Sequence, residues 1–163
     1  LVRADFYNPL AQFAVKATNP LLLPLRKIIP GYAKIDFASL VLALLLQILE
    51  IYILLLIKGF NLAPNVLSFV GLFIWSIGEL LDLFLVFIFF ATLMQVIASW
   101  IQPGYNPGLI LLARITEPFF TPVRKILPDL GMIDLSPMVV IFLIYLARMV
   151  IATPIMIYGK GLI

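Results

Sequence analysis

Three long apolar runs, at residues 37–57, 83–101 and 135–157, dominate the pattern of the chain. Each run is aliphatic or aromatic apart from a few isolated polar residues. An α-helix of about 20 residues crosses a hydrocarbon core of about 30 Å, so the pattern predicts three membrane-spanning helices. A fourth apolar stretch, 66–78, is shorter, and is expected either to lie in the interface or to extend the second span outward.

Two tryptophans help to place the second span. Trp75 and Trp100 are separated by roughly 37 Å of helix, which approximates the distance between the two aromatic belts of a bilayer. The second span is therefore expected between them, with Glu79 and Asp82 in its first two turns from the outer side. Glycine, asparagine and proline in segment 59–65 predict a short external loop.

The polar segments before the first and third runs are rich in proline. Asn8 and Asn106 each precede a proline, which predicts an N-cap followed by a short amphipathic helix. Both helices are expected to end before Pro20 or Pro118, because the residue before a proline is driven out of the α region. A proline-broken elbow then follows each helix, expected to lie on the bilayer surface or to form a shallow re-entrant loop. These elbow segments are 20–30 and 118–128.

The two proline-rich segments carry the same motif at a constant separation of 98 residues. The motif is Y-N-P-x8-T-x-P-x3-P-x-R-K-I-x-P-x4-I-D, and it occupies residues 7–36 and 105–134. A duplication this specific predicts an all-α polytopic membrane protein of two parallel repeats, each combining membrane spans with a proline-broken amphipathic elbow. The first repeat is assigned to residues 1–58, the external loop to 59–65 and the second repeat to 66–163, and a further span is expected before the first residue.

The basic residues predict the orientation. Eight of them fall beside the two motifs and two fall on the opposite side, which places the elbows in the cytoplasm by the positive-inside rule. The eight are Arg3, Lys16, Arg26, Lys27, Lys34, Arg114, Arg124 and Lys125, and the two are Lys58 and Lys160. A multi-pass protein of the bacterial inner membrane, with its elbows facing the cytoplasm, is the predicted location.

Composition narrows the function. The chain of 163 residues is 64% hydrophobic and 12% charged, which excludes an ordinary soluble domain. It has no cysteine and no histidine, so disulfides, thiol nucleophiles and the usual transition-metal sites are excluded. Motifs for nucleotide binding or hydrolysis are also missing from the sequence. We therefore expect neither an enzyme nor a cofactor or metal. With only two or three charges in each motif copy, we also expect no nucleic-acid partner.

Four ionisable residues fall within or beside the apolar runs: Glu50, Glu79, Asp82 and Arg148. Charged groups in the bilayer core are costly unless they are paired, so they are predicted to form an intramembrane charge cluster. Glu50 and Arg148 occupy equivalent positions of the two repeats, and Glu79 and Asp82 share one helix face. The cluster could fix helix packing, with Arg148 neutralising the acids, or the surplus carboxylates could form a cation or proton site. As a third alternative, the charged side chains could simply extend to the membrane surface.

The motifs contain two further candidate sites. The pairs Arg26–Lys27 and Arg124–Lys125 are expected to contact anionic lipid headgroups, or alternatively a cytoplasmic partner. The end of each motif is an aspartate directly before an apolar run. Asp36 and Asp134 are therefore predicted to cap the next span, since a carboxylate accepts the free N–H groups of a helix start.

The order of these motifs resembles that of the YggT/YlmG family over essentially the whole chain. The likeness is most specific at 118–137, where T-E-P-F-F-T-P-V-R-K-I-L-P is followed by I-D-L-S-P. The first copy departs from this pattern at Asn19 and at Ala38-Ser39. The resemblance implies a small, non-enzymatic protein of bacterial inner membranes or plastids, linked to osmotic stress tolerance and ion balance, and in some lineages to division or assembly of membrane complexes.

Two functions follow as hypotheses. The first is a membrane scaffold or regulatory subunit, acting as a homo-oligomer or in a larger membrane complex. The second is a small oligomeric cation channel or transporter that uses the intramembrane carboxylates. A continuous polar path through Gln47, Glu79, Asp82 and Gln95 would favour transport, whereas individual pairing of these residues would favour a scaffold.

Overall fold

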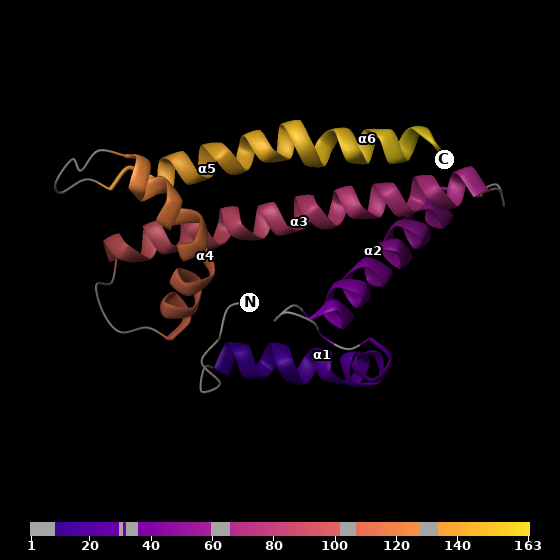
Figure 1. The fold of residues 1–163 in the computed structure, drawn as a ribbon, viewed down its shortest axis with the longest axis horizontal. Helices are drawn as coiled ribbons and strands as arrows, with labels where there is room; N and C mark the ends of the chain where they lie inside the picture. Colours follow the sequence, from indigo (N-terminus) through magenta and orange to yellow (C-terminus); the bar gives the residue numbers. More distant parts are fainter. Residues whose placement is uncertain (1–8, 30, 32–35, 60–65, 102–106, 128–133) are drawn as a thin grey trace. The chain divides into compact units, whose positions relative to one another are not determined.

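The computed structural model describes residues 9–29, 31, 36–59, 66–101, 107–127 and 134–163. All regular structure within these ranges is helical, as the sequence predicts. Figure 1 labels the α-helices and colours them by their position in the sequence. The chain divides into two compact units, which are described separately below. One unit contains residues 1–17 and 85–147, and the other contains residues 18–84 and 148–163.

Within the described residues, three helical stretches are long and apolar enough to cross a membrane, and this confirms the predicted membrane-type fold. The first is α2 (Phe37–Ile57), whose bounds agree with the predicted run. The second lies in α3 (Val66–Ile101). The third runs through α5 (Ser136–Ala147), the π-helical segment η1 (Arg148–Ala152) and α6 (Thr153–Gly161).

The helix α3 absorbs the fourth apolar stretch. Residues 66–78 continue without interruption into the predicted second span, so the outward extension is the correct alternative. Glu79 and Asp82 lie in the interior of this helix of 36 residues, one and two turns after Trp75. Their expected place near the outer side of the bilayer stays a prediction. The inner aromatic belt was predicted at Trp100, whose side chain the structure does not describe.

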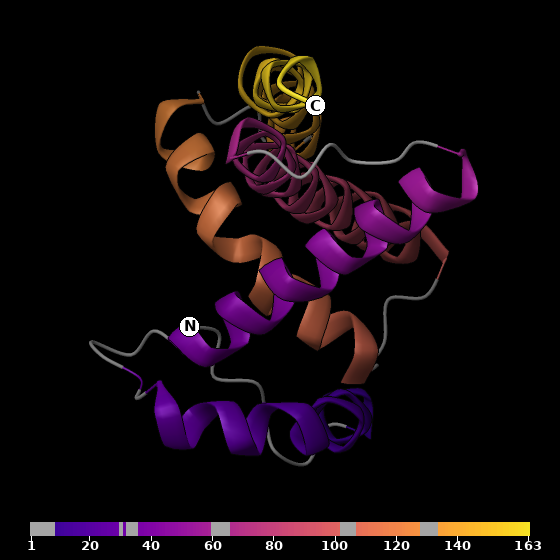
Figure 2. The same ribbon diagram turned by 90° about the vertical axis from the view of Figure 1, so that its right-hand side faces the viewer.

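The proline-rich helices are longer than predicted. Helix α1 (Pro9–Ile28) and helix α4 (Pro107–Ile126) each run through two internal prolines, so the expectation that they end before Pro20 and Pro118 is wrong. A proline removes one backbone donor but leaves the rest of the helical ladder in place, and a bend accommodates its ring. Figure 2 shows α4 as one bent helix. Asn8 and Asn106, the predicted caps of these helices, lie outside the described residues.

In the second unit, α2 and α6 both pack against α3. Ile51 and Leu55 of α2 form an apolar cluster with Leu72 and Trp75 of α3. On α6, Gly159 lies so close to α3 that an added Cβ would stand 2.7 Å from the Trp75 Cα atom. Figure 1 shows α6 running along this half of α3. Glycine permits this approach because nothing but backbone separates the two helices.

The first unit is built around helix α4, which packs against α5. Its buried side chains are mostly apolar, and they come from three helices. They are Leu85, Ile88, Ala91, Phe120, Val123, Val140 and Ile144. Two fully buried threonines, Thr92 and Thr116, lie among them. The Thr116 hydroxyl donates to Gln95 of α3, whose side-chain oxygen lies 2.6 Å from the Thr116 Oγ1 atom, whereas the Thr92 Oγ1 atom has no hydrogen-bond partner among the described residues.

The third apolar stretch changes its helical geometry at Arg148. The segment η1 is π-helical over five residues, and α6 begins directly after it with Pro154 in its first turn. Proline cannot donate to the carbonyl four residues earlier, so wider hydrogen bonding before Pro154 relieves the conflict. The consequence is that side chains before and after η1 face directions that an unbroken α-helix would not give them.

Candidate functional site

Arg148 and Asp82 form a two-pronged ion pair inside the second unit. The Arg148 Nε atom donates to Asp82 Oδ1 at 2.7 Å, and the Nη2 atom donates to Oδ2 at 3.0 Å. The Asp82 side chain is 18% exposed and that of Arg148 is 37% exposed. This parallel arrangement is the strongest geometry available to an arginine and a carboxylate.

The helices explain how the pair is positioned. Asp82 lies in the interior of α3, and Arg148 is the first residue of η1 in the stretch Ser136–Gly161. Both residues are therefore about three to four turns from either end of the segments that could span a bilayer. A charged group at such a depth requires a counter-ion, and each residue supplies one to the other.

Glu79 lies one turn before Asp82 and has partners of its own. The Trp75 indole N–H donates to Glu79 Oε1 at 2.8 Å, and the Lys160 ammonium lies 3.8 Å from the same oxygen. The ammonium also lies over the Trp75 ring, 4.7 Å from its centroid. Sequence reasoning treated Lys160 only as an orientation signal. The spacing of Trp75, Glu79 and Asp82 on one face of α3 could have indicated a polar seam, but not which cation meets it.

Glu50 belongs to a different contact. The Gln47 side chain, one turn earlier on α2, donates to Glu50 Oε2 at 2.9 Å. The described contacts therefore join Asp82 to Arg148 and Glu79 to Lys160, while those of Glu50 run along its own helix. Among the described residues, no group of three acidic side chains is placed to hold a metal ion. A functional role for the predicted four-residue cluster stays a prediction.

The motif arginines and aspartates form a clamp in each copy. In the first copy, the Arg26 Nε atom donates to Asp36 Oδ2 at 3.1 Å, and the Ser39 hydroxyl donates to the same oxygen at 2.7 Å. Asp36 is the N-cap of α2 and accepts the Ser39 backbone N–H. The Arg26 hydrogen bond, followed by that of Ser39, lowers the pKa of Asp36 to about 2. The clamp thus ties the last turn of α1 to the start of α2.

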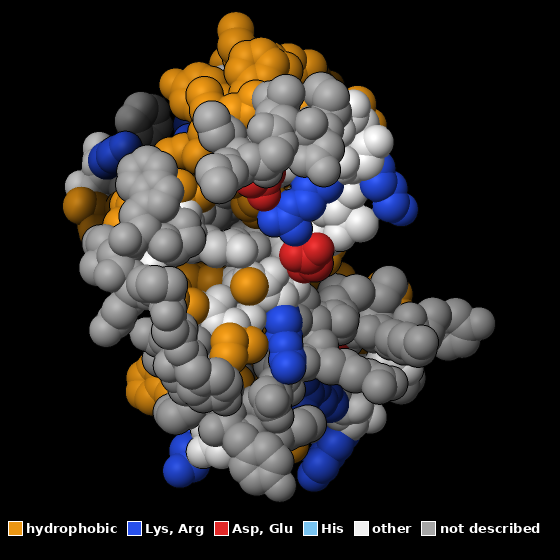
Figure 3. Space-filling view, turned by 90° about the vertical axis from the view of Figure 1, so that its left-hand side faces the viewer, with side chains coloured by type: hydrophobic (Ala, Val, Ile, Leu, Met, Phe, Trp, Pro, Cys, Tyr) orange, Lys and Arg blue, Asp and Glu red, His pale blue; other side chains and the backbone are white. Residues whose placement is uncertain are grey.

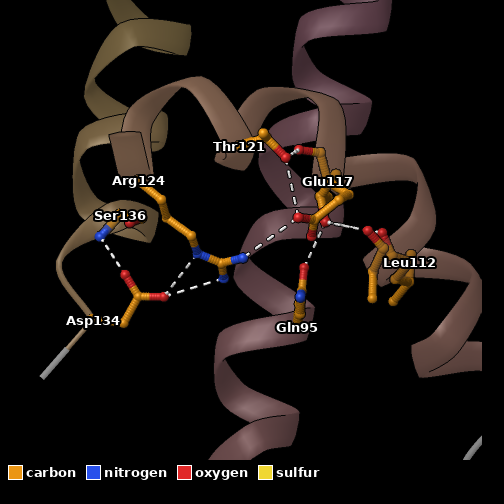
Figure 4. A network of polar contacts seen from close by, with 9 residues as sticks. Gln95, Leu112, Glu117, Thr121, Arg124, Asp134 and Ser136 are labelled. Atoms are coloured by element: carbon orange, nitrogen blue, oxygen red, sulfur yellow. Dashed lines mark hydrogen bonds and ion pairs between the residues drawn. The ribbon is translucent and has the colours of Figure 1, made fainter. Parts of the chain in front are cut away.

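The second clamp is similar but not identical, as Figure 4 shows. Arg124 donates to Asp134 Oδ2 from Nε at 3.3 Å and from Nη2 at 3.1 Å. Asp134 accepts the backbone N–H of Ser136 at 2.9 Å, and the pKa of Asp134 is lowered by Ser136 first and Arg124 after it. Pro137 occupies the position of Ser39 and has no N–H to offer, which explains the shift to Ser136.

A second carboxylate meets the arginine of this clamp. Glu117 Oε1 lies 3.6 Å from the Arg124 Nη1 atom, and the Thr121 hydroxyl donates to the same carboxylate oxygen at 3.1 Å. Lys27 and Lys125, the remaining basic residues of the two motif pairs, are both exposed. On the face drawn in Figure 3, the visible acidic side chains lie directly beside basic ones.

Comparison with known proteins identifies the family. A family model described as CCB3/YggT matches residues 2–57 and 74–155. The chain belongs to the CCB3/YggT family. It is 38% identical over 161 residues to the uncharacterized protein YggT of Escherichia coli K12, an alignment that covers 98% of this chain and 80% of that protein. No solved structure matches the chain.

Two further relatives support the assignment to CCB3/YggT. An uncharacterized protein of Pseudomonas aeruginosa, PA0392, is 52% identical over 138 residues, which are 84% of this chain and 68% of that protein. An uncharacterized protein of Haemophilus influenzae is 40% identical over 147 residues, which are 87% of this chain and 73% of that protein. The predicted resemblance to the YggT family is therefore confirmed.

The Asp36 clamp leads to a pH-dependence prediction. Because the pKa of Asp36 is lowered in the folded protein, its charged form stabilises the fold above the ordinary value of 3.8, and this contribution is lost as pH falls towards about 2. Asp36→Asn keeps a capping oxygen but removes the charge that Arg26 contacts. We expect the melting temperature in detergent to be lower for this variant at pH 5, and the gap to wild type to close towards pH 2. A gap that does not change with pH would contradict the assigned role.

Proposed function

We propose that this protein is a non-enzymatic scaffold or regulatory subunit in the bacterial inner membrane, crossing it several times. The observation that supports this role best is the individual pairing of the polar groups in the apolar helices. A transport path needs polar side chains that face water and exchange partners with an ion. A scaffold needs polar side chains that hold its helices in one arrangement.

Each of the four residues that separate the two hypotheses has a protein partner at hydrogen-bond distance. Gln47 meets Glu50, Glu79 meets Trp75, Asp82 meets Arg148 and Gln95 meets Thr116. The first three contacts lie in the second unit and share no residue with one another, and the fourth lies in the first unit. Individual pairing of these side chains favours a scaffold over a transport path.

The outer faces of the helices support the same proposal. Helix α2 presents large apolar side chains, among them Leu46, Leu49 and Ile53, each about half exposed. In a bilayer these side chains contact lipid or the helices of another membrane protein. A scaffold of this size would use such faces to assemble, either with further copies of itself or in a larger membrane complex.

The arrangement that we propose in the membrane follows the duplicated motif. Two parallel repeats would place the basic ends of α1 and α4 on the cytoplasmic side, since eight basic residues lie near the motifs. A role in osmotic stress tolerance and ion balance is part of this proposal and is supported by the family resemblance. In that role the protein would act on the assembly or activity of other membrane proteins.

Ion flux from liposomes tests the scaffold against the channel. We expect liposomes that contain the purified protein to release potassium or protons no faster than protein-free liposomes, and Glu79→Gln and Asp82→Asn to leave that rate unchanged. Because Glu79 and Asp82 each have a protein partner in this arrangement, neither variant should open or close a path. Flux that requires the protein and is abolished by Asp82→Asn would replace the scaffold with a cation channel.

A further inference from the structure

The two arginine clamps differ in one charge. Each arginine donates to the aspartate ten residues later, Arg26 to Asp36 and Arg124 to Asp134. Seven residues before the arginine, two helical turns back on the same face, the first copy has Asn19 and the second has Glu117. A neutral amide cannot neutralise a guanidinium, whereas a carboxylate can. The first clamp therefore keeps more of its positive charge than the second.

Glu117 forms an ion pair with Arg124. Its carboxylate lies 3.6 Å from the Arg124 Nη1 atom, so Arg124 lies between two acids. Thr121 donates to Glu117 from the following turn and holds the carboxylate in place, as Figure 4 shows. Leu23 stands where Thr121 stands in the second copy, so this support is also missing from the first.

The first clamp is anchored next to a candidate membrane span. Asp36 caps α2, and α2 is apolar from Phe37 onward, so the hydrogen bond from Arg26 holds the last turn of α1 beside the first residue of this candidate span. The opposite face of α1 is apolar and exposed. Leu21, Pro24 and Ile28 line it at helical spacing, and Ile28 is 80% exposed. The last turns of α1 thus combine exposed apolar side chains with the exposed cations Arg26 and Lys27. This combination suits the acyl chains and the charged headgroups of a lipid leaflet.

We propose that the last turns of α1 form a binding site for the phosphate headgroup of an anionic lipid, with Arg26 and Lys27 as its cations. The apolar face of α1 contacts the acyl chains, and the lipid phosphate accepts hydrogen bonds from the guanidinium and the ammonium. In the second copy, Glu117 occupies the electrostatic position that the phosphate would take at Arg124. The site is thus confined to one of two otherwise matching motifs. It does not depend on whether the protein is a scaffold or a channel.

An exchange of the two distinguishing residues tests the site. The purified full chain is titrated with phosphatidylglycerol in detergent, with phosphatidylcholine as the neutral control, and bound lipid is counted by native mass spectrometry. Asn19→Glu is expected to weaken phosphatidylglycerol binding about fivefold, the effect of roughly one charge at an anionic surface. Glu117→Asn is expected to add a second binding event of similar strength. Both residues are on the helix surface, and circular dichroism checks that each variant keeps its helices.

The lysines locate the bound lipid. In wild type, Lys27→Gln should weaken phosphatidylglycerol binding, and the matched variant Lys125→Gln should change it much less. In the double exchange, Asn19→Glu with Glu117→Asn, the sensitivity should move to Lys125. Equal binding of phosphatidylcholine, or an unchanged affinity in both exchange variants, overturns the proposal. Displacement of the lipid by inorganic phosphate at concentrations that leave other lipid contacts intact overturns the commitment to a lipid ligand.

Discussion

Replacing Arg148 by alanine is expected to lower the free energy of unfolding by about 3 kcal/mol, the lower end of the loss for a buried ion pair, because this pair is only partly buried. The reason is the charge left behind. Asp82 accepts two hydrogen bonds from the Arg148 guanidinium, and without them its carboxylate stays in the apolar interior of α3 with less compensation. Equilibrium unfolding in mixed detergent micelles, with increasing dodecyl sulfate, measures the change.

Two companion variants separate charge pairing from simple loss of contact. Arg148→Ala combined with Asp82→Ala removes both charges and should recover much of the stability, because no uncompensated ion remains. Arg148→Lys keeps the charge but cannot form the two parallel hydrogen bonds, so we expect an intermediate stability. If the double variant is as unstable as the sum of the two single variants, the ion pair is not what stabilises this region.

Gly159→Ala is expected to destabilise the protein by about 2–3 kcal/mol, although the added group is only a methyl. The new Cβ atom would stand 2.7 Å from the Trp75 Cα atom and 2.8 Å from the Gly71 carbonyl oxygen. Both are backbone atoms, so no side chain can rotate away, and α6 must move off α3. Such a movement would also disturb the contacts of Lys160 with Trp75 and Glu79.

Gly161 supplies the matched control. It lies two residues later in the same helix, and an added Cβ there meets nothing within 4 Å. Gly161→Ala should therefore be neutral or slightly stabilising, since alanine favours the helix over glycine. The same unfolding titration compares the two variants. Equal stability of Gly159→Ala and Gly161→Ala would show that α6 does not approach α3 this closely in the folded protein.

Local sequence features were good predictors wherever one segment decides its own structure. The bounds of α2 follow from its apolar run, because a continuous apolar segment of that length can satisfy its backbone only as a helix in a membrane. Asp36 was predicted as a cap because it directly precedes that run. The same local reasoning failed at Pro20 and Pro118. The residue before a proline prefers an extended conformation, but the remaining backbone hydrogen bonds of α1 and α4 outweigh this preference and keep both helices continuous.

Sequence alone determined that this is a helical membrane-type protein with a motif written twice, since hydrophobicity, length and repetition are properties of segments. The tertiary structure decided which charges meet. Arg148 pairs with Asp82 and Lys160 with Glu79 because α6 lies against α3 through Gly159, and because η1 changes the direction in which Arg148 points. Pairing of this kind depends on the rotation and approach of two helices. Those quantities arise from packing between distant segments, and no single segment contains them.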